Sequence, residues 1–108
     1  MKLEDKVNKW FTDKDLQYAP IEGQLLKLQE EVDELKQAYA EMDRLEIIDA
    51  IGDIQVVLHG VCLQLEEQHG LKVTPQFALG KAYTVIKSRT GRYNPETKMW
   101  EKDQWYGR

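Results

Sequence analysis

The chain has 108 residues, of which 42% are hydrophobic and 31% charged, and it contains only 3 prolines and 7 glycines. These proportions are typical of one globular domain, and they exclude both a disordered chain and an enzyme with separate substrate and cofactor domains. The net charge of −4 argues against a nucleic-acid-binding protein that depends on phosphate contacts. We therefore expect a single domain over residues 1–108.

The sequence also indicates a compartment. Its single cysteine, Cys62, cannot form an internal disulfide, and the first ten residues lack the apolar segment of a signal peptide. The longest apolar stretch, residues 47–65, is interrupted by polar residues that include Asp49, Asp53, Gln55 and His59. No segment therefore has the ~18 to 20 apolar residues of a membrane span, and we expect a cytoplasmic protein that does not enter a membrane.

Hydrophobic periodicity predicts helices in the first part of the chain. Residues 2–11 carry apolar side chains at steps of three and four and indicate a short amphipathic helix that ends near Thr12. A second helix begins at about Pro20, which is tolerated in a first turn, and continues to about Met42.

The third predicted helix is capped by Asp43, with Glu46 in the capping-box position three residues later, and it stops at Gly70. Its apolar residues occur almost all round the helix, so their burial requires a partner subunit. We expect a homodimer or a homotetramer.

The last quarter of the chain predicts one more helix and a short non-helical end. Thr74 and Pro75 form an N-cap and first-turn signal, and this helix breaks before Gly91. The turn formers Asn94 and Pro95 predict a small hairpin or an ordered tail. The expected fold is all-α: an oligomeric bundle of four helices with this short C-terminal element.

Charge is distributed unevenly along the chain. Between residues 22 and 53 ten acidic side chains oppose three basic ones, whereas from residue 81 onwards seven basic side chains oppose three acidic ones. Such asymmetry is explained either by two solvated faces or by a site for a metal-bound polyphosphate.

Six of the acidic residues form two ridges. Three fall within an arc of roughly 100° on the second helix, and three fall within about 60° on the third. They are Glu30, Glu31 and Glu34 on the second helix, and Glu46, Asp49 and Asp53 on the third.

The surroundings of these acids favour a metal site. Asp49 and Asp53 lie in an apolar run, where an ionised carboxylate is destabilising by several kcal/mol unless it is paired or binds a metal. Ligands that are all oxygen favour Mg²⁺, accept Mn²⁺ and argue against Zn²⁺. The alternative is an exposed acidic face with ion pairs at i and i+4, such as Lys27 with Glu31.

The same segments carry a resemblance to a known family. QLLKLQEEVDEL, followed after a short connection by EIIDAIGDIQVVL, resembles the paired EExxE and ExxD signature of the MazG-like all-α nucleoside triphosphate pyrophosphohydrolases. AYTVIKSRTGRY is similar to the AYxxIKxRxGxM segment of small phage and bacterial members, and the resemblance covers about residues 8 to 93. It implies Mg²⁺-dependent hydrolysis of a (deoxy)nucleoside triphosphate between the α and β phosphates, in the host cytoplasm for a phage-encoded member.

The second motif matches in two registers. Glu46 to Asp49 is an intact ExxD, whereas in the register that ends at Asp53 the glutamate position is occupied by Ala50. The division of roles among the three acids of the third helix therefore stays open.

The resemblance implies roles for the six acids. Glu31, Glu34 and Asp53 are the first choices as metal ligands, and Asp49 and Glu46 complete the set. Glu30, which stays off the metal, is the candidate catalytic base that accepts the proton of the attacking water.

Basic and aromatic residues are candidates for substrate binding. Near the end of the fourth helix, cationic side chains could clamp phosphate oxygens, although each is equally well explained as solvated charge. They are Lys81, Lys87, Arg89 and Arg92. A base could stack on an aromatic ring, although such residues at helical spacing belong more often to a core; the candidates are Trp10, Tyr83, Trp100 and Trp105.

Two further residues are interpreted as packing residues. His59 and Cys62 have no second His or Cys at a suitable spacing, so we assign them neither to a metal site nor to a nucleophile. Two alternatives to triphosphate hydrolysis remain: a hydrolase of a signalling nucleotide such as guanosine tetraphosphate (ppGpp), and a non-catalytic helical oligomerisation or regulatory module.

Overall fold

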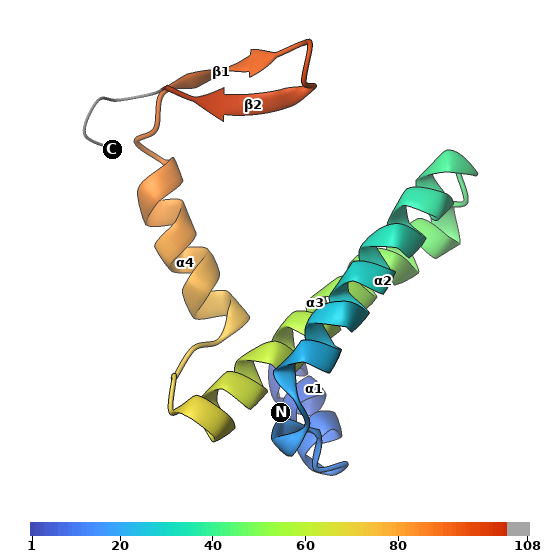
Figure 1. Ribbon diagram of the computed structural model, residues 1–108, viewed down its shortest axis with the longest axis vertical. Coiled ribbons are helices and arrows are strands. Elements are labelled where there is room, and N and C mark those ends of the chain that lie inside the picture. Colours follow the sequence, from blue (N-terminus) through green and yellow to red (C-terminus); the bar gives the residue numbers. More distant parts are fainter. Residues whose placement is uncertain (104–108) are drawn as a thin grey trace. The chain divides into compact units, whose positions relative to one another are not determined.

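The computed structural model describes residues 1–103 (Figure 1). The chain divides into two compact units, Met1–Pro75 and a second unit that begins at Gln76. In chain order the elements are α1 (Leu3–Thr12), the 3-10 helix η1 (Leu16–Tyr18), α2 (Ile21–Ala40), α3 (Arg44–His69), α4 (Pro75–Ile86), β1 (Gly91–Asn94) and β2 (Met99–Lys102). The prediction of four helices followed by a small hairpin is confirmed. The single domain and the oligomer stay predictions.

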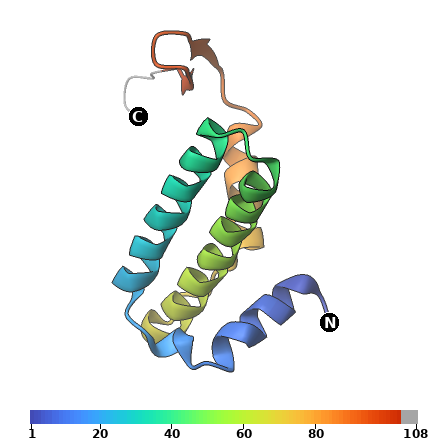
Figure 2. The ribbon, with the colours of Figure 1, turned by 90° about the vertical axis from the view of Figure 1, so that its right-hand side faces the viewer.

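The first unit is built on the pairing of α2 with α3. Figures 1 and 2 show these two long helices side by side and antiparallel, with α1 across the end of the pair where α2 begins. The small apolar core of the unit is formed by Phe11, Ala38, Ala50 and Val57, all of them buried. It is supplemented by Gln24 on α2, whose Nε2 donates to the backbone oxygen of Val57 on α3 at 3.3 Å.

Glutamine side chains on α3 hold the segment between α1 and α2. Gln64 is fully buried, and its Nε2 donates to the backbone oxygen of Leu16 in η1 at 3.0 Å. One turn later, Nε2 of Gln68 donates to the backbone oxygens of Gln17 and Ala19 at 2.9 and 2.6 Å. These bonds attach η1 and the residues that follow it to α3, in addition to the bond that the Leu16 oxygen accepts from the N–H of Ala19 at 3.1 Å.

A tight turn of three residues, 41–43, joins α2 to α3. Met42 adopts the left-handed conformation with φ of 50°, and the N–H of Asp43 donates to the Ala38 oxygen at 3.0 Å, so α2 ends in a Schellman motif. The Asp43 carboxylate then accepts from the N–H of Glu46 at 3.2 Å, which confirms the predicted cap. At the other end of α3, Gly70 has φ of 67° and is the predicted stop.

The second unit contains most of α4 and the hairpin. The strands are antiparallel, with Gly91 opposite Lys102 and Asn94 opposite Met99. The Asn94 side chain accepts from the N–H of Glu96 at 2.9 Å and so organises the predicted turn. The alternative of an ordered tail falls partly on residues 104–108, outside the described residues. Over residues 1–103, no helix combines the length and the apolarity needed to cross a bilayer.

Candidate metal centre

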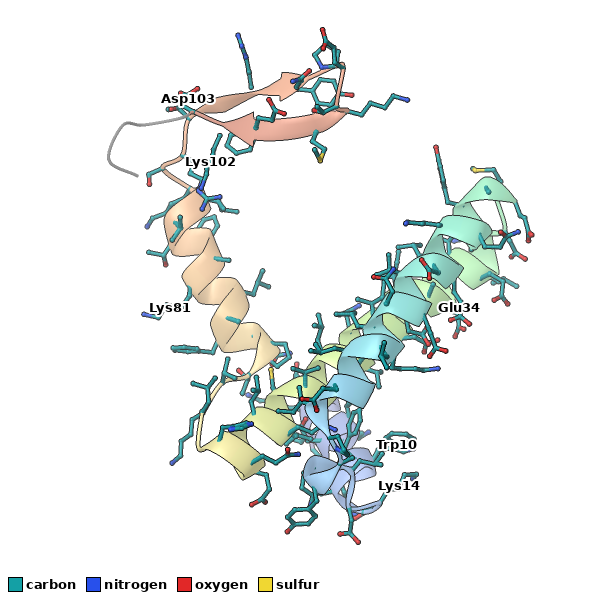
Figure 3. All side chains as sticks on the ribbon, viewed as in Figure 1. Trp10, Lys14, Glu34, Lys81, Lys102 and Asp103 are labelled. Carbon is teal, nitrogen blue, oxygen red and sulfur yellow. The ribbon has the colours of Figure 1, made fainter. Side chains whose placement is uncertain are left out.

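Three carboxylates from α2 and α3 converge on one side of the helix pair. Glu31 and Glu34 lie one turn apart on α2, and Asp53 faces them from α3. One oxygen from each carboxylate lies within 4.8 Å of the others. In Figure 3 the labelled Glu34 marks this part of α2, where carboxylate oxygens crowd together. Over residues 1–103, no other group of three such ligands is formed.

The three carboxylates differ in their access to water. Glu31 is buried with 4% of its surface exposed, Asp53 is half-buried and Glu34 is exposed. Oε1 of Glu31 lies 3.3 Å from Nζ of Lys27, whereas its buried Oε2 has no hydrogen-bond partner among the described residues. A buried carboxylate oxygen without a partner is destabilising, and a bound cation would satisfy it.

The surroundings of Asp53 also disfavour a negative charge. Burial raises the pKa of its carboxyl above the ordinary value of 3.8, and the negative charges of Asp49 and Glu31 raise the pKa further. The ionised form of Asp53 is therefore disfavoured where it stands. A divalent cation between these acids would remove the repulsion, because it attracts each of the carboxylates.

The donor set suits a hard cation. All three ligands are carboxylate oxygens, which Mg²⁺ and Mn²⁺ accept. Mg²⁺ binds oxygen at about 2.1 Å, which places its ligands roughly 3 to 4 Å apart, so small side-chain rotations would bring these oxygens into reach. The exposed Glu34 leaves one side open to solvent, where further ligands can approach.

The other three acids predicted for the site lie outside this group. Glu46 and Asp49 are exposed on α3 and stand outside the three-carboxylate cluster, although Asp49 is close enough to raise the pKa of Asp53. Glu30, the predicted base, is exposed on α2, and its Oε2 lies 3.8 Å from Nζ of Lys27. Of the two registers of the second motif, the structure brings Asp53 to the glutamates of α2.

The predicted phosphate-binding residues all belong to the second unit. All four are exposed: Lys81, Lys87, Arg89 and Arg92. The ammonium of Lys81, labelled on α4 in Figure 3, lies 5.5 Å from the ring centroid of Phe77. Their role in substrate binding stays a prediction.

The aromatic candidates are surface residues. Trp10, Tyr83 and Trp100 are each about half exposed, so none belongs to the core, and Trp105 lies outside the described residues. The rings of Trp10 and Phe11 pack edge to face. The ammonium of Lys14 lies 4.4 Å from the ring centroid of Trp10. Trp10 and Lys14 are labelled in Figure 3.

His59 and Cys62 stand outside the acidic cluster. His59 is buried on α3, and Cys62 is half-buried three residues later. Burial raises the pKa of the Cys62 thiol, which disfavours the thiolate that a nucleophile requires. Both positions are compatible with their interpretation as packing residues.

Comparison with protein-family models, with curated protein sequences and with solved structures gives no match for this chain. The acidic cluster and the motif residues themselves are therefore the features from which a function can be inferred. One neighbour of the cluster, Lys27, was not among the expected site residues. Its i, i+4 ion pair with Glu31, named above for the alternative of an exposed acidic face, is formed, although Glu31 itself is buried.

Proposed function

We propose that the chain is a Mg²⁺-dependent nucleotide pyrophosphohydrolase that cleaves (deoxy)nucleoside triphosphates between the α and β phosphates, with Mn²⁺ as an effective substitute. The observation that carries the proposal is the buried, unpartnered Oε2 of Glu31 beside Glu34 and Asp53. The resemblance of both motifs to the MazG-like enzymes supports the same chemistry.

In this proposal the acids near the cluster have three kinds of task. Glu31, Glu34 and Asp53 hold the cation, and Asp49 adds negative charge beside them. A bound Mg²⁺ supplies charge neutralisation on the phosphate chain, which otherwise repels an incoming oxygen. Glu30 is outside the cluster and solvent-exposed, and its carboxylate, which lies 3.8 Å from the Lys27 ammonium, accepts the proton of the attacking water.

Substitution of the buried ligands tests the proposal. The double variant Glu31→Gln, Asp53→Asn removes two of the three charges while it preserves side-chain size. We expect pyrophosphate release from deoxynucleotides with Mg²⁺ to fall by at least about 100-fold, because the site loses its cation. EDTA should abolish the activity of the wild-type chain.

A matched control carries the same change of charge away from the cluster. Asp33 on α2 and Glu66 on α3 are both exposed, and neither belongs to the three-carboxylate group. The double variant Asp33→Asn, Glu66→Gln should retain activity. Equal activity of the two double variants would refute the assignment of the site.

A substrate panel separates the remaining alternatives. Release of pyrophosphate from guanosine tetraphosphate, with none from triphosphates, would indicate the signalling-nucleotide hydrolase. A chain that hydrolyses no nucleotide with Mg²⁺ or Mn²⁺ would instead be the non-catalytic helical module.

We also propose that the chain acts as a homodimer or homotetramer. Within the first unit, apolar side chains on the helix pair are exposed: Leu25 and Tyr39 on α2, and Ile48, Ile51 and Leu58 on α3. Exposed apolar residues gathered on a pair of packed helices mark an interface more often than a free surface.

A further inference from the structure

Lys27 stands at the solvent edge of the acidic cluster. Its ammonium lies 3.3 Å from Oε1 of Glu31 and 3.8 Å from Oε2 of Glu30, so it links the buried ligand to the proposed base. Its side chain is 54% exposed, and over residues 1–103 no other ion pair involves the six motif acids. The ammonium of Lys27 is thus shared between two carboxylates.

Building on the proposed function, we propose that Lys27 is a substrate-binding residue that exchanges partners. Without a divalent cation, its ammonium pairs with Glu31 and Glu30. When a cation binds to Glu31, the ammonium turns to the polyphosphate chain of the nucleotide.

The first argument for the exchange is electrostatic. A divalent cation at Glu31 repels the ammonium, which already lies within ion-pair distance of the same carboxylate. The existing ion pairs are exposed and hold Lys27 only weakly. The lysine stem is flexible and carries three rotatable donors, so reorientation towards a new anion requires no movement of the backbone.

The second argument is the charge balance of the site. Three carboxylates with one divalent cation retain one net negative charge, which repels a polyphosphate. Asp49 and Glu30 add to this negative charge, and Lys27 offsets part of it. Lys36, the next basic residue on α2, follows nine positions later and lies about 180° away round the helix, so it faces the other side.

Two binding measurements on the full chain test the proposal. The first is the affinity for Mn²⁺ alone, measured by calorimetry. The second is the affinity of the Mn²⁺-loaded chain for a triphosphate analogue with a methylene bridge between the α and β phosphates. For Lys27→Met we expect Mn²⁺ to bind about 2- to 5-fold tighter, because a competing cation is gone. The analogue should bind about 10-fold more weakly.

Two further variants define the result. Lys27→Arg keeps the positive charge and should retain most of the affinity for the analogue, and Lys36→Met should leave both affinities unchanged. If Lys27→Met weakens Mn²⁺ and the analogue equally, or changes neither, the exchange is refuted.

The outcomes for the two proposals are distinguishable. Absence of Mn²⁺ binding by the wild-type chain would overturn both. A wild-type chain that binds Mn²⁺ and hydrolyses nucleotides, together with a Lys27→Met variant that behaves like it in both measurements, would overturn only the role of Lys27.

Discussion

At the scale of single residues, Gly60 determines how closely α1 and α2 approach α3. A Cβ at this position would lie 2.5 Å from Nε2 of Gln24 and 2.6 Å from Cε1 of Phe11. Phe11 is part of the buried core, and Gln24 donates to the Val57 oxygen one turn before Gly60. A methyl group at position 60 therefore displaces side chains from both neighbouring helices.

We expect Gly60→Ala to lower the free energy of unfolding by about 1 to 2 kcal/mol, because overpacking outweighs the better helix propensity of alanine. Denaturation by urea measures this difference. Gly52→Ala is the matched control, since a Cβ at Gly52 on the same helix has nothing within 4 Å. That control should raise the free energy of unfolding by about 0.5 to 1 kcal/mol. A stabilising Gly60→Ala would contradict the close packing.

At the scale of elements, the α2–α3 pair holds its acids at the expense of stability. The pKa of Asp53 is raised in the folded protein above the value of 3.8, so the folded state binds this proton more readily than the unfolded state. The contribution of Asp53 to stability is therefore fully present below about pH 3.8 and is lost as the pH rises through the raised pKa.

We expect Asp53→Asn to melt at a temperature about 4 °C higher than the wild type at pH 7 in EDTA, because it removes the disfavoured charge. The difference should disappear below about pH 4, where Asp53 is protonated in both states. Addition of Mg²⁺ should stabilise the wild type and leave Asp53→Asn unchanged. Melting curves over this pH range provide the measurement, with Asp33→Asn as the control. An Asp53→Asn variant that is less stable in EDTA at pH 7 would contradict the prediction.

Much of the secondary structure is predictable because local chemistry decides it. The cap at Asp43 and the stop at Gly70 coincide with the ends of α3, and the hairpin turn forms at Asn94. The grouping of acids on one face of α2 follows from their spacing alone. Which acid of α3 faces them depends on the register of the two helices, and no motif specifies that register.

Other features depend on tertiary contacts and leave no local signal. The burial of Glu31 and the unpartnered state of its Oε2 arise from the packing of α2 on α3. The close approach at Gly60 requires Phe11 from a distant part of the chain. Aromatic residues at helical spacing were left between base stacking and the core, and Trp10 and Tyr83 are about half exposed, because periodicity does not reveal how much of a helix its neighbours cover.

At the scale of the whole molecule, the helix pair has two unlike sides. Leu25 lies about 180° from Glu34 on α2, and Ile51 lies about 160° from Asp53 on α3. Since Glu34 and Asp53 meet on one side, the exposed apolar residues share the opposite side. With α2 about 30 Å long and helices packed about 10 Å apart, this apolar side covers roughly 600 Å². Each partner of a standard interface buries about 800 Å², so this apolar side supplies most of the area that one partner of such an interface requires.

We expect the double variant Ile51→Glu, Leu58→Glu to dissociate the oligomer, because four like charges would face one another across a two-fold interface. Sedimentation equilibrium of the wild type should give at least twice the mass of one chain, and the variant should give the mass of one. Leu26→Glu is the control, since Leu26 is 70% exposed and lies about 100° further round α2 than Leu25. A monomeric wild type would remove this interface.

The three-residue turn at Met42 has a kinetic consequence. Glu31 and Asp53 are only 22 positions apart along the chain, and nearly all of those positions belong to the two helices that the turn joins. Closing so short a segment loses little chain entropy, and folds dominated by such nearby contacts form within microseconds to milliseconds. We therefore expect these acids to come together early in folding, so that the cation proposed for them would act as a nucleating ligand for the α2–α3 pair.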